Sequence, residues 1–309
     1  MRIVSTGEVL WDVFEGSEFL GGAPLNFSVT ALRLGHSITL LTAVGVDQRG
    51  TKALQEIKSL GLEAEFIQII DECATGTAIV SIDSFGNATY MIQRPAAFDC
   101  FRANDSELTR LQDLRPDWIY YGTLAQTDEG TESFLHQLIH TCSGARCFYD
   151  MNLRTGHWSL PLVQRLSGLA TILKLNEAEA ELLYTLTHGS GEFCLEEFCR
   201  FWASAYAIEI VCVTLGGKGC AVFAEDRLQT FAGVPVSVVD TVGAGDAFAA
   251  AFLHGHCLGW SIDRTSCFAN ALGALIASRA GATPLWSLDE CLQLAASVSR
   301  GAIRGGLTR

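Results

Sequence analysis

The amino-acid sequence predicts an α/β fold: a three-layer α/β/α sandwich with a mainly parallel central sheet and a small β-sheet lid. Three observations lead to this prediction. Short apolar runs alternate with helical patterns along most of the chain, as expected when helices connect parallel strands. Residues 75–93 break this rhythm with a hairpin pattern. Hydrophobic residues make up 49% of the 309 residues, so the chain has enough apolar material for a large core.

The alternation of strand and helix begins at the N-terminus. Apolar runs predict strands at Ile3–Thr6, Ile38–Val44, Trp118–Gly122, Cys147–Met151, Ile172–Leu175 and Ile210–Leu215. Helical patterns occupy Pro24–Leu34, Gly50–Leu60 and Glu132–Cys142. From about Asp246 onward the sequence is rich in alanine and mostly helical in pattern. We therefore expect a series of βαβ units.

The hairpin region consists of two strand-like stretches, TAIVSID and ATYMIQ, joined by a turn at Ser84–Asn87. A second short extended pair, Val9–Phe14 and Glu18–Leu20, occurs near the N-terminus. We expect both pairs to form one small sheet that acts as a lid, with lid segments at about 9–22 and 75–99. No linker rich in Pro, Gly or Ser divides the chain, which predicts a single domain over residues 1–309.

Charge and composition exclude several functions. The formal net charge is -13, and no basic cluster occurs, which argues against binding to nucleic acid or to an anionic membrane. No run of about 18 apolar residues is present, and the N-terminus lacks a secretory signal, so we expect a cytoplasmic protein. The 11 cysteines are scattered without a C-x-x-C pair, and we expect them to be buried, reduced thiols.

The segment Val238–Phe248 carries the clearest chemical signal. An extended stretch ends near Asp240, a Gly-Ala-Gly turn follows, and a helix begins. Glycines just before a helix let backbone N–H groups converge, and the helix start adds about half a positive charge there. We expect an anion-binding turn that has no cationic side chain, with Asp246 facing the same pocket. The alternative is that the glycines only form a turn and Asp246 only stabilises the helix start.

The string DTVGAGDAF at 240–248 resembles the C-terminal signature of the ribokinase-like carbohydrate kinases of the phosphofructokinase-B type. The N-terminal signature of that family has a counterpart in Gly21–Asn26, and the resemblance extends from about residue 3 to 290. It implies a ribokinase-like fold, ATP as phosphoryl donor and Asp246 as catalytic base. The amides of Gly243, Ala244 and Gly245 would hold the charge that develops on the transferred γ-phosphoryl group.

Other segments resemble the nucleotide and metal sites of the same family. Asn176 and Glu179 resemble its N-x-x-E element, which organises Mg²⁺ through water; the alternative is a plain helix cap with Glu three residues after Asn. The loop after Ile210–Leu215 resembles the nucleotide-side loop, although a simple β-turn would explain it as well. The resulting nucleotide-binding candidates are Asn176, Thr214, Gly216, Gly217, Gly219 and, near the adenine, Asn270.

The resemblance also implies a potassium site behind the anion-binding turn. Its ligands would be backbone carbonyls around Asp240, Val242, Arg279 and Gly281. Leu285 stands where some relatives have a serine ligand, which argues against potassium activation.

Candidate sugar ligands come from three parts of the chain. Asp12 and Asn26 are expected to bind hydroxyls, and Gly21–Gly22 to allow close approach of the sugar. Asp150–Arg154, followed by Trp158, resembles the D-x-N-x-R…W segment of fructokinases and 2-keto-3-deoxygluconate kinases, which implicates Asn152 and Arg154. Arg94 resembles a lid arginine of fructokinases, but Phe98 before Asp99 departs from their pattern.

We therefore expect a magnesium-dependent, ATP-dependent sugar kinase of the fructokinase type that phosphorylates a primary hydroxyl. A 2-keto-3-deoxygluconate kinase is the nearest alternative, because Arg154 could pair with a carboxylate. A nucleoside kinase and a catalytically silent sugar- or nucleotide-binding regulator remain further alternatives. The exposed edges of the lid sheet also suggest a homodimer through the lid.

Overall fold

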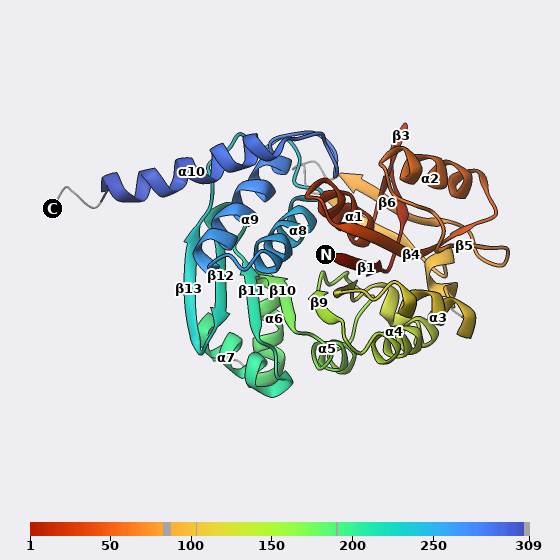
Figure 1. Cartoon of the computed structure of the whole chain (residues 1–309), viewed down its shortest axis with the longest axis horizontal. Helices are drawn as coiled ribbons and strands as arrows, with labels where there is room; N and C mark the ends of the chain where they lie inside the picture. The colour runs from red at the N-terminus through yellow and green to blue at the C-terminus, as the bar shows by residue number, and fades with distance from the viewer. Residues whose placement is uncertain (83–87, 103, 190, 306–309) are drawn as a thin grey trace. The chain divides into compact units, whose positions relative to one another are not determined.

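The computed structural model describes residues 1–82, 88–102, 104–189 and 191–305 (Figure 1). The expected turn at Ser84–Asn87 lies outside these residues. The chain forms two compact units, Met1–Arg146 (unit 1) and Cys147–Arg309 (unit 2). That the whole chain acts as one domain stays a prediction.

Unit 1 contains four parallel strands in the order β8-β1-β4-β5. Their bounds are β1 Arg2–Thr6, β4 Ser37–Gly45, β5 Ile67–Ile70 and β8 Trp118–Gly122. The α-helices of the unit are α1 Ala23–Arg33, α2 Gln48–Ser59, α3 Asp105–Asp113 and α4 Glu129–Thr141, and its 3₁₀ helices are η1 Ala97–Cys100 and η2 Ala125–Thr127. The predicted strands and helices of this unit are confirmed to within three residues, whereas β5 and α3 were not predicted.

The small sheet of unit 1 is confirmed. It has four strands in the order β3-β2-β6-β7, with β2 Leu10–Phe14, β3 Ser17–Gly21, β6 Gly76–Ile82 and β7 Ala88–Gln93. Strands β2 and β6 run parallel, while the two outer pairs are antiparallel. Asp12 pairs with Phe19 and Ala78, and Val13 pairs with Glu18 and Ile79. Because neighbouring residues of a strand face opposite sides, these two rows lie on opposite faces of the sheet.

Unit 2 contains five strands in the order β13-β12-β11-β10-β9. Strands β9 Arg146–Asp150, β10 Ile172–Asn176 and β11 Ile210–Thr214 are parallel, and β12 Gly219–Ala224 and β13 Arg227–Ala232 continue the sheet as antiparallel strands. The helices are α5 Leu160–Ser167, α6 Glu177–His188, α7 Leu195–Tyr206, η3 Gly216–Lys218, α8 Ala244–Cys257, α9 Ile262–Ala277 and α10 Leu288–Gly305. The helical C-terminal third is thus confirmed, and α8 packs closely beside α9 (Figure 1).

The interiors of both units are apolar. In unit 1, Phe27 of α1 stacks on Tyr120 of β8, with ring centroids 3.8 Å apart. In unit 2, Phe248 and Phe252 stack one helical turn apart on α8, because residues four apart share one face of a helix. None of the described helices is long and apolar enough to cross a membrane.

Candidate active site

The predicted catalytic turn begins α8 in unit 2. Gly243 is the N-cap residue in the left-handed region at φ 76°, and a Cβ there would collide with the backbone of Ala282, so the position requires glycine. The helix starts with a bond from Ala247 N–H to the Gly243 carbonyl at 2.9 Å. Asp246 lies in the first helical turn and is only 8% exposed. The amide of Ala244 donates to the Thr241 carbonyl at a long 3.3 Å.

A cation lies beside this turn, contrary to the prediction of an anion site without one. The Nζ atom of Lys174 on β10 would be 3.2 Å from a Cβ placed on Gly245. The same Nζ lies 2.9 and 3.2 Å from the two carboxylate oxygens of Asp150, at the end of β9. Asp150 is fully buried and the Lys174 side chain is 9% exposed. Burial alone would lower the pKa of Lys174, but the negative charges of Asp150 and Asp246 outweigh it and raise the pKa above its ordinary value.

Asn176 and Glu179 form a reciprocal capping box at the start of α6. Asn176 Oδ1 accepts the Glu179 N–H at 2.9 Å, and Glu179 Oε2 accepts the Asn176 N–H at 2.8 Å. The other oxygen, Glu179 Oε1, accepts the N–H of Leu153 at 2.7 Å and so fixes the loop that contains Asn152 and Arg154. Burial raises the pKa of Glu179, and its hydrogen bonds offset this only in part. The structure therefore contains the helix cap of the alternative interpretation. Glu179 in addition holds the loop of the D-x-N-x-R segment through Leu153.

The loop after β9 presents the two candidate sugar residues of unit 2. Asn152 adopts a left-handed backbone at φ 48°, a conformation that asparagine tolerates better than most residues. Arg154 is exposed and forms no ion pair with any residue in the described parts of the chain. The loop therefore offers an amide and an unpaired guanidinium close in sequence to the buried Asp150.

Five of the six predicted nucleotide residues line one cavity of about 250 Å³ in unit 2. Two residues of the catalytic turn, Ala244 and Gly245, line the same cavity, which joins the two predicted elements. Apolar side chains such as Val236, Val238 and Phe248 form much of the wall. The predicted residues in the lining are Thr214, Gly216, Gly217, Gly219 and Asn270, whereas Asn176 is not among them.

Asn270 has a defined structural role at this cavity. Its side-chain amide donates to the carbonyls of Phe231 and Ala232, each at 3.2 Å. These bonds hold the end of β13 against α9 and leave the side-chain oxygen as the group available to a ligand. Gly219 adopts φ 109°, and a Cβ there would collide with the Phe231 carbonyl, so the loop and β13 approach closely only because residue 219 is glycine.

The two segments of the predicted potassium site lie together. The Asp240 carboxylate accepts the N–H of Val242 and the N–H of Gly281, each at 3.0 Å. Arg279, in the second segment, forms an ion pair with Glu290 at 2.7 Å. The aspartate side chain, which sequence reasoning did not use, thus joins the two loops.

In unit 1, Asp12 and the first glycine signature meet at one end of the small sheet. Asp12 Oδ2 would be 3.0 Å from a Cβ on Gly21. Gly22 begins α1 at φ 114°, where a Cβ would collide with the Glu8 carbonyl. Asn26 lies in the first turn of α1 and is buried, and its N–H donates to the Gly22 carbonyl at 3.0 Å. The glycines therefore let Asp12 and the helix start approach each other.

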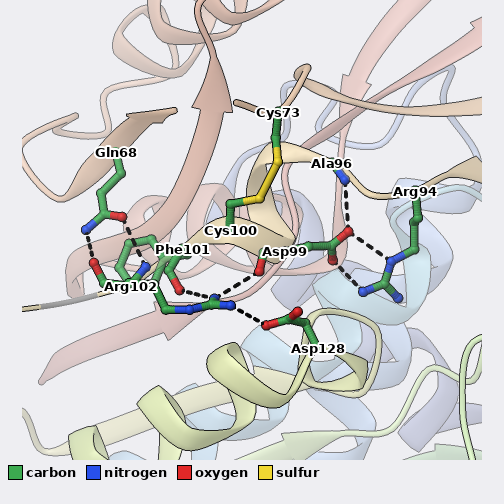
Figure 2. Close-up of a disulfide and its surroundings, with 9 residues drawn as sticks. All are labelled: Gln68, Cys73, Arg94, Ala96, Asp99, Cys100, Phe101, Arg102 and Asp128. Atoms are coloured by element: carbon green, nitrogen blue, oxygen red, sulfur yellow. Dashed lines mark hydrogen bonds and ion pairs between the residues drawn. A yellow bond between two sulfur atoms is a disulfide. The ribbon is translucent and has the colours of Figure 1, made fainter. Parts of the chain in front are cut away.

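Arg94 is not a free cation (Figure 2). Its guanidinium forms a two-pronged ion pair with Asp99, one bond of which, from Nε to Oδ2, measures 3.0 Å. It also donates to the Leu124 carbonyl at 3.2 Å and to the Thr127 hydroxyl. The Arg94 side chain is 15% exposed. Its guanidinium carbon lies 5.7 Å from the ring centroid of Phe98, the buried residue that departs from the fructokinase pattern. Asp99 therefore fixes where the Arg94 charge lies.

The expectation that all cysteines are reduced is wrong for one pair. Cys73, just before β6, and Cys100, at the end of η1, form a disulfide next to Asp99 (Figure 2). Both residues are half-buried and lie outside the long apolar runs. Their separation of 27 residues follows no recognisable pattern, so only the fold reveals the pair. The other nine cysteines, all in the described part of the chain, are free thiols.

A second cavity, of about 580 Å³, lies in unit 1 between the small sheet and the start of α2. Arg94 is the one predicted substrate residue in its lining; Asp12, Gly21, Gly22 and Asn26 are absent from it. The strand register explains this separation. Thr77 and Gln93, which line the cavity, pair in the row of Trp11, so they face away from Asp12.

The ribokinase-like carbohydrate kinases share these features: an α/β fold with a mainly parallel sheet, a small accessory sheet and a glycine turn beside a cavity. The chain belongs to the pfkB family of carbohydrate kinases, whose family profile matches residues 2–290.

Individual relatives agree with this assignment. The chain is 29% identical to a fructokinase of Escherichia coli over 244 residues, 76% of each chain. Its fold is similar to that of a fructokinase from Xylella fastidiosa with bound ATP, with a TM-score of 0.82, 23% identity and coverage of 96% of this chain and 99% of the other. A 2-dehydro-3-deoxygluconokinase from Thermotoga maritima is similar at a TM-score of 0.81 and 18% identity, over 96% and 99%.

Proposed function

We propose that this carbohydrate kinase transfers the γ-phosphoryl group of ATP to a primary hydroxyl of fructose. One observation supports the nucleotide half of this proposal: five of the six residues predicted as nucleotide ligands line a single cavity together with Ala244 and Gly245 of the predicted catalytic turn. The sugar half is supported by relatives named fructokinase, such as those of Escherichia coli and Zea mays.

The cavity of unit 2 suits a nucleotide. Its volume of about 250 Å³ and its apolar wall fit a flat aromatic base. The glycines at 216, 217 and 219 keep side chains away from the loop, so that backbone N–H groups are within reach of phosphates. ATP, when bound, supplies the γ-phosphoryl group that the sugar hydroxyl takes, and ADP leaves.

The carboxylate and the backbone of this turn have different roles in the proposed reaction. Asp246 accepts the proton that the attacking hydroxyl loses. The N–H groups at the start of α8 and the helix dipole stabilise negative charge on the phosphoryl oxygens. Burial keeps water away from Asp246 and strengthens these interactions.

Magnesium would be held through water. The donor atoms of Asn176 and Glu179 are oxygens, which suit Mg²⁺, but each already accepts a backbone N–H. A hydrated ion can share these oxygens, whereas a directly bound ion would have to displace hydrogen bonds that hold α6. Bound there, Mg²⁺ would neutralise phosphate charge. The loops joined by Asp240 are the candidate potassium site, although Leu285 argues against activation by potassium, and turnover with K⁺ replaced by Na⁺ decides between the two.

The residues that we propose as sugar ligands are Asp12, Gly21, Gly22, Asn26, Arg94, Asn152 and Arg154. A second candidate substrate, 2-keto-3-deoxygluconate, is favoured by one observation. Arg154 is exposed and has no ion-pair partner in the described parts of the chain, so a substrate carboxylate could pair with it.

An ADP-release assay over a panel of ketoses, aldoses, sugar acids and nucleosides tests the proposal. Fructose should give the highest kcat/KM. A higher value for 2-keto-3-deoxygluconate would replace fructose by the sugar acid. Absence of turnover with every acceptor, for a folded protein that binds ATP in calorimetry, would favour a silent binding protein and refute the proposal.

We further propose a homodimer through the small sheet and a cytoplasmic location. Ile79 and Met91 face the same side of this sheet as a cross-strand pair, and both are exposed. Sedimentation of an Ile79→Lys, Met91→Lys variant should give a monomer if they form the interface.

Structural disulfides are rare in reducing compartments, so mass spectrometry of alkylated protein from intact cells tests the location together with the Cys73–Cys100 bond.

A further inference from the structure

Lys174 occupies a position that a lysine rarely takes. It lies in the middle of the otherwise apolar strand β10, next to Asp150 of β9 in the parallel register. Both Asp150 oxygens contact its Nζ, at 2.9 and 3.2 Å, and both side chains are buried. Replacing such a pair by apolar residues often leaves stability unchanged or raises it, so stability alone is a weak reason for the pair.

The ammonium also reaches the catalytic turn. Its Nζ would lie 3.2 Å from a Cβ added to Gly245, and Asp246 is the next residue. An ammonium has three N–H donors, and the two bonds to Asp150 leave one of them for another acceptor. The positive charge of Lys174 therefore lies where α8 begins and where Asp246 enters the site.

We propose that Lys174, anchored by Asp150, is a positioning residue for Asp246: its ammonium orients the Asp246 carboxylate and balances its charge. This inference rests on the proposed function of Asp246 as proton acceptor. A carboxylate and a phosphoryl group are both anionic and repel each other at short range. A fixed cation beside Asp246 reduces this repulsion without occupying the space that the substrates need. Asp150 holds the cation in place, because a lysine side chain is otherwise flexible.

A purely structural pair makes a different prediction. Lys174→Met alone leaves the Asp150 charge buried without its partner, so this variant should be less stable under either view. The double variant Asp150→Asn, Lys174→Met removes both charges at similar volume and should recover much of the lost stability. If the pair is only structural, catalysis recovers with stability. If Lys174 positions Asp246, catalysis does not recover.

The experiment compares wild type, both variants and Arg200→Met, which removes an exposed cation of the same unit. We expect kcat to fall about 100-fold in the single and the double variant, as for loss of one preorganised group at a reacting centre. KM for the sugar and the calorimetric Kd for ATP should change less than about threefold, because Asp246 acts after binding. Arg200→Met should match wild type. Recovery of kcat in the double variant would overturn the proposal, and so would a change confined to ATP affinity.

A readout without turnover separates this proposal from the proposed function. The ¹³C signal of the Asp246 carboxyl, identified as the signal lost in Asp246→Asn, is recorded at pH 7 in the absence of nucleotide. It should shift in the double variant and stay unchanged in Arg200→Met. An unshifted signal would refute the action of Lys174 on Asp246, even in a protein that phosphorylates fructose. A shifted signal in a protein that phosphorylates no sugar would instead refute the proposed function alone.

Discussion

Two carboxylates of unit 1 and a cluster of three in unit 2 are held in different ways. In unit 1, Asp47 accepts from Gly50 N–H and from both the N–H and the hydroxyl of Thr75, and Asp99 is paired with Arg94. In unit 2 the buried carboxylates of Asp150, Glu179 and Asp246 all act on the single ammonium of Lys174.

The difference distinguishes a scaffold from a chemical site. A carboxylate that has its own hydrogen-bond or ion-pair donors is stable as an anion and fixes a loop, as Asp47 and Asp99 do. Crowded buried carboxylates are costly and are characteristic of reacting centres. Asp47 and Asp99 therefore serve to fix loops, whereas unit 2 has an excess of negative charge around the predicted catalytic aspartate.

Loss of the catalytic carboxylate in the crowded cluster should have the largest effect. Asp246→Asn keeps the shape of the side chain but cannot accept the hydroxyl proton, so kcat should fall about 10³-fold. The Kd for ATP in calorimetry should stay within about threefold, because the amides of the turn are unaffected. Asp263→Asn, an exposed position in the first turn of α9, is the matched control. Turnover retained by Asp246→Asn would remove this residue from its proposed role.

The glycine turn at the start of α8 was predictable because its determinants are contiguous. Gly243, Ala244, Gly245 and Asp246 act through local backbone geometry and a helix start, and a string of residues specifies both. The parallel strands were predictable for a similar reason, since buried strands appear as unbroken apolar runs.

The Lys174–Asp150 pair and the Cys73–Cys100 disulfide were not predictable in the same way. They depend on strand register and on loop paths that join residues 24 and 27 positions apart. One signal was available: a lysine inside an apolar strand needs a buried partner, and Asp150 lies near the end of the preceding predicted strand, Cys147–Met151. The partner of Arg94 could similarly have been sought in Asp99, five residues later.

In unit 1, the Cys73–Cys100 disulfide should contribute more to stability than any single charge. Cys73→Ser, Cys100→Ser should lower the free energy of unfolding by about 3 kcal/mol, because an unbridged loop of this length gains entropy in the unfolded chain. Urea unfolding without reductant measures the difference. The free thiol variant Cys257→Ser is the control. Equal stability of wild type with and without dithiothreitol would contradict the prediction.

The Arg94–Asp99 pair should come next. Asp99→Asn keeps one acceptor for Arg94 but removes the charge, and we expect a loss of about 2 kcal/mol in the free energy of unfolding. The KM for the sugar should rise about tenfold if Arg94 has to be held in one place to bind it, with KM for ATP unchanged. Asp128→Asn, which removes the charge beside the exposed Arg102, is the matched control and should change neither KM. A sugar KM equal to that of wild type would show that Arg94 does not bind the sugar.

The smallest effects concern the two helix-start carboxylates, and they should have opposite pH dependence. Hydrogen bonds from Thr75 and Gly50 overcome the opposing effect of burial and lower the pKa of Asp47. The stability that Asp47 contributes is therefore present above its unfolded pKa of about 3.8 and is lost as the pH falls through the lower folded value. Asp47→Ala should cost about 1 kcal/mol at pH 7, as for loss of a helix N-cap. This cost should shrink below pH 4, and a cost that stays constant there would contradict the prediction.

Glu179 should show the reverse. Because burial raises its pKa, the folded protein binds a proton more readily than the unfolded chain does, and stability should fall as the pH rises from about 4.5 through the higher folded value. Glu179→Gln cannot ionise, so its free energy of unfolding should lack this decline, and the difference between variant and wild type should grow as the pH rises across the window. Urea unfolding in magnesium-free buffer from pH 4 to 8 measures both slopes, and Glu181→Gln, an exposed glutamate two residues further along the same helix, is the control. If the free energy of unfolding changes with pH equally in wild type and Glu179→Gln, the buried cluster tolerates the Glu179 charge as easily as unit 1 tolerates that of Asp47. The contrast between the two units would then be one of packing and not of charge.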